Sequence, residues 1–152
     1  MNPEIPLAYL HFVALIGTAS LLVAEVALCQ PGLQGAALKR LRKIDSLYAL
    51  FAVATLATGA MRVFWGAKGS AYYFANPVFH TKFTLFVLVG LASILPTVRY
   101  IGWDKAARRD PGFAPADAAV AGVRRWLALQ LLMLLAIPLL AAMMARGITA
   151  FH

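Results

Sequence analysis

Four apolar stretches dominate the sequence and limit the folds that are open to it. They cover approximately residues 7–29, 46–65, 79–99 and 126–144. A helix needs about 20 apolar residues to cross the hydrocarbon core of a bilayer. The chain is 62% apolar and 13% charged, about half the charge of a water-soluble domain. We therefore predict a single integral membrane domain over residues 1–152, an all-α, four-helix transmembrane bundle.

The net charge of +8 is concentrated in two of the three connections between these stretches. Four cations lie in the first connection, six lie between Arg99 and Arg125, and the second connection holds only Lys68. Lysine and arginine accumulate in the cytoplasmic loops of membrane proteins. The pattern predicts a multi-pass protein of the bacterial inner membrane with both termini outside the cytoplasm. It favours membrane lipid over nucleic acid as the partner of the basic residues.

Several residues predict where helices begin, bend or end. Asp45 or Ser46 is expected to cap the second helix by accepting a hydrogen bond from a free amide, and Pro96 to bend or end the third helix. The connection after Arg99 is expected to be mobile.

Cys29 is the only cysteine, which excludes an internal disulfide.

Polar and small residues recur with helical spacing in three of the predicted helices. We call these three stripes polar seams, and such seams let neighbouring helices pack closely. They are predicted to face the bundle interior. His80 lies about 200° around the helix from Lys82, so it is predicted to face lipid. The seams consist of His11, Thr18 and Glu25; of Asp45, Tyr48, Ala52, Thr55, Gly59 and Arg62; and of Lys82, Phe86, Gly90, Ser93 and Thr97.

Depth along the helices separates these polar residues into two groups. His11, Arg62 and Lys82 fall near the outer end, where two fixed cations in a bilayer cost several kcal/mol unless they are neutralised. An anionic ligand would neutralise them, and so would lipid headgroups and water reached by long side chains. Glu25 falls at the inner end with Asp45 and Gln130. There it is expected to pair with a nearby cation: Arg42, Lys43 or Arg124.

Three segments together resemble a known family. They are "YLHFVALIGTASLLVAE", "KRLRKIDSLYALFAVATLATGAMRVF" and "VFHTKFTLFVLVG". In their first-helix histidine and their later His-x-Lys they resemble the HemJ-type protoporphyrinogen oxidases. They also resemble a related group of small bacterial membrane proteins of unknown function, and more loosely the CopD-type copper-resistance domains.

The HemJ resemblance implies b-type haem (heme b), a metal-binding iron site and an oxidoreductase role related to protoporphyrinogen oxidation. It implies His11 as the haem ligand, with Lys82 as a ligand or a propionate partner. Four-helix bundle cores host haem between facing helices. Haem propionates would neutralise Arg62 and Lys82, or Lys68. The second axial ligand stays open between Lys82, His80 and His11 of the partner subunit in a homodimer.

The candidate cofactor-binding residues are therefore His11, Tyr48, Arg62, Lys68 and Lys82. The candidate metal ligands are His11, His80 and Lys82. A quinone is a further small-molecule candidate. Two functions from other classes compete with haem binding: copper handling through His11, His80 and methionines, and a membrane scaffold that has no cofactor.

Overall fold

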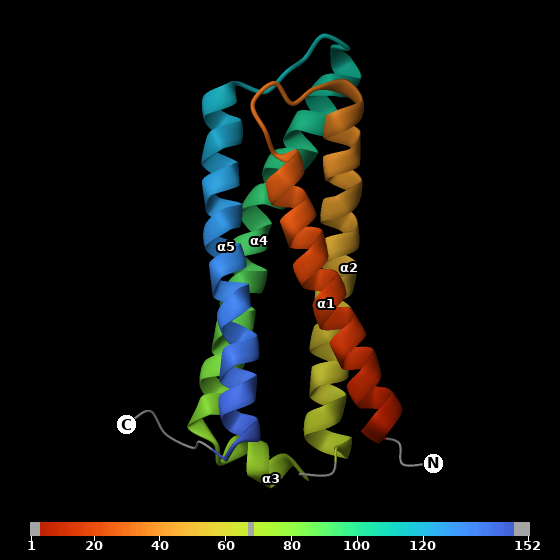
Figure 1. Ribbon diagram of the computed structural model, residues 1–152. Helices are drawn as coiled ribbons and strands as arrows, with labels where there is room; N and C mark the ends of the chain where they lie inside the picture. The colour runs from red at the N-terminus through yellow and green to blue at the C-terminus, as the bar shows by residue number, and fades with distance from the viewer. Residues whose placement is uncertain (1–3, 67–68, 148–152) are drawn as a thin grey trace.

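Four long helices form the protein (Figure 1). The computed structural model describes residues 4–66 and 69–147. Each long helix has the length and apolar composition to cross a membrane, and the described residues contain no strand. The predicted all-α, four-helix transmembrane bundle is confirmed. Its long helices are α1 (Glu4–Leu28), α2 (Gly35–Trp65), α4 (Pro77–Arg109) and α5 (Asp117–Ala145), and a short helix, α3 (Gly69–Phe74), precedes α4.

The four long helices are arranged as two closely packed pairs. α1 packs mainly against α2, and α4 packs mainly against α5, with fewer contacts between the pairs. The start of α1, the end of α5 and α3 share one end of the bundle, which we call the α3 end (Figure 1). The connections 29–34 and 110–116 share the other end, which we call the loop end. Which end faces the cytoplasm stays a prediction from charge.

α2 begins eleven residues earlier than predicted, at Gly35 instead of residue 46. The basic segment before the apolar stretch is helical because Leu38 and Leu41 continue the buried face at helical spacing, while Lys39 and Lys43 lie outside it. The predicted cap at Asp45 or Ser46 was wrong. Asp45 lies inside α2 and is only 2% exposed.

α4 and α5 are also longer than predicted. α4 continues through Pro96 to Arg109, and its added turns bury Tyr100 and Trp103. α5 begins at Asp117 instead of residue 126. Most of the connection that was expected to be mobile is therefore helical, because hydropathy marks only the segment inside the hydrocarbon and an amphipathic helix can continue beyond it.

Burial confirms two of the three polar seams. Thr18, Glu25, Asp45, Tyr48 and Thr55 are all buried. The third seam is confirmed only in part: Lys82, Phe86, Ser93 and Thr97 are half-buried, whereas Gly90 is exposed. α4 instead buries larger side chains on a neighbouring line that faces the rest of the bundle, consisting of Val78, Val89, Pro96, Tyr100 and Trp103.

The apolar core is divided into two clusters of unequal size. The larger cluster fills the loop-end half of the bundle and includes Leu22, Tyr100 and Leu127. A small cluster at the α3 end is built from Val63, Tyr73, Val78 and Met144. Along α4, Lys82 lies between these clusters and is only half-buried.

Candidate functional site

His11 on α1 is held against α2 by a hydrogen bond to Thr58. The two atoms, His11 Nδ1 and Thr58 Oγ1, are 3.0 Å apart. The Thr58 hydroxyl also donates to the carbonyl oxygen of Ala54 at 2.7 Å. A hydroxyl has one proton to donate, so Thr58 accepts its second bond from a protonated His11 Nδ1. In the neutral ring, the lone pair then lies on Nε2.

Gly59 makes room for the His11 ring. A Cβ atom at position 59 would lie 3.2 Å from His11 Cε1, which is closer than ordinary van der Waals contact. The missing side chain lets the imidazole lie directly against α2. Thr58 and Gly59 together set the tautomer and the position of the ring, in the way that neighbouring groups orient histidines that bind metals.

Two cations lie near this histidine. Arg62 follows Thr58 by one turn of α2, and Lys82 is on α4; both are within electrostatic range of His11. The Arg62 guanidinium is 5.8 Å from the centre of the Phe12 ring, and the Lys82 ammonium is 5.7 Å from that of Phe79. These aromatic contacts stabilise a cation without neutralising it.

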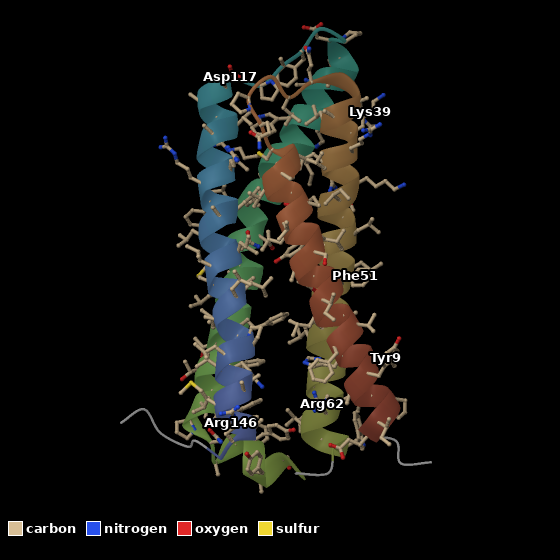
Figure 2. The ribbon with its side chains drawn as sticks, viewed as in Figure 1. Tyr9, Lys39, Phe51, Arg62, Asp117 and Arg146 are labelled. Carbon is tan, nitrogen blue, oxygen red and sulfur yellow. The ribbon has the colours of Figure 1, made fainter. Side chains whose placement is uncertain are left out.

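Neither Arg62 nor Lys82 forms an ion pair with a carboxylate among the described residues. Both side chains are half-buried, and Figure 2 shows Arg62 near the α3 end of the bundle. His11, Arg62 and Lys82 therefore lie within electrostatic range of one another. We call these three residues the His11 cluster.

His80 does not join this cluster. It is exposed, and its Nε2 lies 2.9 Å from the carbonyl oxygen of Phe74. The exposure of His80 and the partial burial of Lys82 match the faces predicted from helical spacing. Within residues 4–66 and 69–147, no three histidine, cysteine, aspartate or glutamate side chains form a group that could hold a metal ion. Because methionines do not belong to such groups, copper handling through His11, His80 and methionines stays a prediction.

Two other candidate cofactor-binding residues fall outside the cluster. Tyr48 is buried about three turns of α2 away from Thr58, and its hydroxyl accepts a hydrogen bond from Gln130 Nε2 at 2.9 Å. Tyr48 thus joins α2 to α5 in the middle of the bundle. Lys68 lies outside the residues that the structure describes.

A second polar group occupies the loop-end half, and one of its contacts was predicted wrongly. Arg42 Nη1 lies 2.7 Å from the Asp45 carboxylate, which also accepts a hydrogen bond from Thr97 Oγ1 at 2.6 Å. Glu25 was expected to pair with a cation, but it forms no ion pair among the described residues. It is 1% exposed, and its Oε1 has no hydrogen-bond partner.

Gln130 Oε1 is likewise buried without a partner among the described residues, and the Tyr100 side chain lies near Glu25 and Cys29. An unpaired buried polar atom costs about 1–3 kcal/mol. The sequence reasoning had not singled out Tyr100. Its helical spacing from Val89 and Pro96, which lie on the buried face of α4, is the sequence pattern that would have predicted its burial.

Comparison with known proteins identifies a family over nearly the whole chain. The model of the family described as "Predicted membrane protein (DUF2214)" matches residues 4–149. Neither a curated protein nor a solved structure matches the chain. The similarity to HemJ-type and CopD-type proteins therefore rests on the short motifs alone.

Proposed function

Because the chain belongs to the DUF2214 family of predicted membrane proteins, we propose a function within the membrane: it binds an anionic tetrapyrrole, b-type haem, at His11. The proposed role is redox chemistry related to protoporphyrinogen oxidation in the bacterial inner membrane. One observation carries the proposal. Thr58 holds His11 with Nδ1 protonated and the lone pair on Nε2, and two cations that form no ion pair among the described residues lie within electrostatic range of the ring.

The donor set fits an axial haem ligand. Imidazole Nε2 is a common ligand of haem iron, and ligating histidines characteristically donate their other ring N–H to an oxygen acceptor. Thr58 Oγ1 provides that acceptor for His11. Gly59 supports the same function, because it allows the ring to lie against α2.

The charges fit the two carboxylates of haem. Arg62 and Lys82 would bind the propionates, which would neutralise cations that have no carboxylate partner among the described residues. Both side chains are half-buried, and Arg62 lies near the α3 end of the bundle (Figure 2). A charge-assisted hydrogen bond of this kind contributes about 1.5–3 kcal/mol.

The sequence left the second haem ligand open between Lys82, His80 and His11 of the partner subunit, and the surroundings of His80 bear on this choice. His80 is exposed and already contacts the carbonyl oxygen of Phe74, which supports Lys82 or His11 of the partner subunit instead. Bound haem would supply one-electron transfer at a potential set by burial and nearby charge. This chain's own contribution is to bind and orient the group and to hold its charge.

An absorption spectrum of the full chain, purified after expression with a haem precursor, tests the proposal. We expect a Soret band in the wild-type protein and its loss in His11→Ala. His80→Phe is the matched control, because it also removes an imidazole from an outer helix segment. Circular dichroism and membrane fractionation establish that each variant inserts and folds. A wild-type protein without haem, or a folded His11→Ala that keeps it, would overturn the proposal.

A further inference from the structure

A basic groove lies at the loop end of the bundle, between the extensions of α2 and α4. Its volume is about 600 Å³. α2 contributes Lys39, Arg42 and Lys43, and α4 contributes Lys105 and Arg108. Figure 2 shows Lys39 and Arg62 at opposite ends of α2, so this groove is separate from the His11 cluster.

The arginines and lysines of the groove differ in their partners. Arg42 pairs with Asp45 at 2.7 Å, and Arg108 pairs with Asp104 at 2.9 Å. The three lysines are exposed and form no ion pair with any described carboxylate. The only acidic residue that lines the groove, Asp104, is already bound to Arg108. Three ammonium groups therefore face one groove without compensating charge.

Apolar surface continues from this groove toward the middle of the bundle. On α2, Leu50 follows the groove residue Ser46 by four positions, and on α4, Val98 precedes the groove residue Ile101 by three. Residues three or four apart lie on the same helix face. Leu50 is 62% exposed and Val98 is 60% exposed. On both α2 and α4, an exposed apolar strip thus begins next to the cationic groove and continues toward the middle of the bundle. The strip on α2 includes Leu50, and the strip on α4 includes Val98.

We propose that this groove binds the headgroup of an anionic phospholipid, with the lipid's phosphate on the three lysines and its acyl chains along the strips of Leu50 and Val98. Basic pockets between transmembrane helices bind anionic headgroups by this combination of charge and depth. A soluble phosphate would use the lysines equally well and would gain nothing from the apolar strips. The continuity of the two surfaces therefore selects a lipid.

Native mass spectrometry of the full chain in detergent tests this site, with phosphatidylglycerol and phosphatidylcholine of identical acyl chains as probes. The two lipids share a phosphodiester and differ in net charge. Each lysine near an anionic lipid contributes about a factor of five to binding. We expect the triple variant Lys39→Gln/Lys43→Gln/Lys105→Gln to bind phosphatidylglycerol at least about tenfold more weakly than the wild type, with little change for phosphatidylcholine.

The matched control is Arg40→Gln/Arg109→Gln/Arg125→Gln, which removes three exposed cations near the same end that do not line the groove. It should bind phosphatidylglycerol like the wild type. An equal loss in both triple variants, or equal affinity of the wild type for the two lipids, would refute a built site. Competition with inorganic phosphate distinguishes a site for a lipid headgroup from a site for a soluble anion. Displacement of phosphatidylglycerol at comparable concentration would show a soluble-anion site and would also refute the proposal.

Discussion

Thr58 determines which nitrogen of His11 is available for binding. Its hydroxyl lies 3.0 Å from His11 Nδ1 and donates its own proton to the Ala54 carbonyl oxygen. The hydrogen bond therefore runs from the imidazole to the hydroxyl, and Nε2 carries the lone pair. A contact between two adjacent helices thus selects the nitrogen of His11 that the proposed haem would use.

Replacing the Thr58 hydroxyl tests whether its hydrogen bond fixes the tautomer of His11. Thr58→Val keeps the shape of the side chain and removes the acceptor, so His11 is no longer held in one tautomer. We expect haem affinity to fall about tenfold to a hundredfold, as it does when such supporting contacts are lost at metal sites. Haem titration monitored by absorption measures the change. Thr81→Val is the matched control, since Thr81 is exposed and donates only to the carbonyl of Pro77. Equal affinity in both variants would contradict the role of Thr58.

We expect substitutions of Lys82 and His80 to have opposite effects on haem retention, although the two residues are only two positions apart. Lys82→Met keeps most of the apolar stem and removes the charge near His11, so haem retention should fall about tenfold. His80→Phe should retain haem, because His80 is exposed on another face. Haem stoichiometry after identical purification compares them. The reverse ranking would replace Lys82 with a His11–His80 ligand pair.

Gly17 tests how closely α1 and α2 pack. A Cβ atom at this position would overlap the Phe51 ring, so Gly17→Ala must displace that ring. We expect a loss of about 1–3 kcal/mol in the free energy of unfolding, measured by denaturation in detergent. Gly122→Ala is the control, since position 122 in α5 faces open space. There alanine should stabilise the helix by about 0.5–1 kcal/mol. Similar shifts in both variants would rule out close packing at Gly17.

The two buried carboxylates should respond differently to neutralisation. Asp45→Asn leaves Arg42 without its ion pair and weakens the bond from Thr97, so stability should fall by about 1–3 kcal/mol. Glu25→Gln replaces a buried carboxyl group, which forms no ion pair among the described residues, with an uncharged amide of similar shape, so it should be neutral or stabilising. Thermal unfolding of the two variants side by side gives the comparison. A larger loss in Glu25→Gln would show that Glu25 has a partner of its own.

The orientation in the membrane is a prediction from charge alone. With both termini outside the cytoplasm, the basic loop end is cytoplasmic and the His11 cluster lies in the outer half. Reporter fusions after residue 152 should be active when the reporter works only outside the cytoplasm. Fusions within residues 110–116 should show the opposite activity. A reversal of both results would invert the topology and place the proposed haem site in the inner half.

The sequence alone determined which face of α1 and which face of α2 is buried. Thr18 and Glu25 on α1, and Asp45, Tyr48 and Thr55 on α2, are buried because a helix repeats every 3.6 residues and lipid excludes unpaired polar groups. The depth of His11, Arg62 and Lys82 followed from the same local geometry. The number of membrane-spanning helices followed from the apolar stretches. Hydropathy could not set the helix ends, since the extensions of α2 and α4 are stabilised by packing one buried face outside the apolar stretches.

Only the tertiary structure decided which side chains meet, because contacts between helices depend on their relative rotation and height. Those two variables place Thr58 against His11, and they leave Glu25 without the cation that its neighbourhood in the sequence suggested. They also turn α4 so that Tyr100 is buried and Gly90 is exposed. Arg42 lies near Asp45 by helical spacing, but Thr97 reaches the same carboxylate from another helix. Spacing along one helix predicts the faces of that helix, and packing between helices selects the partners.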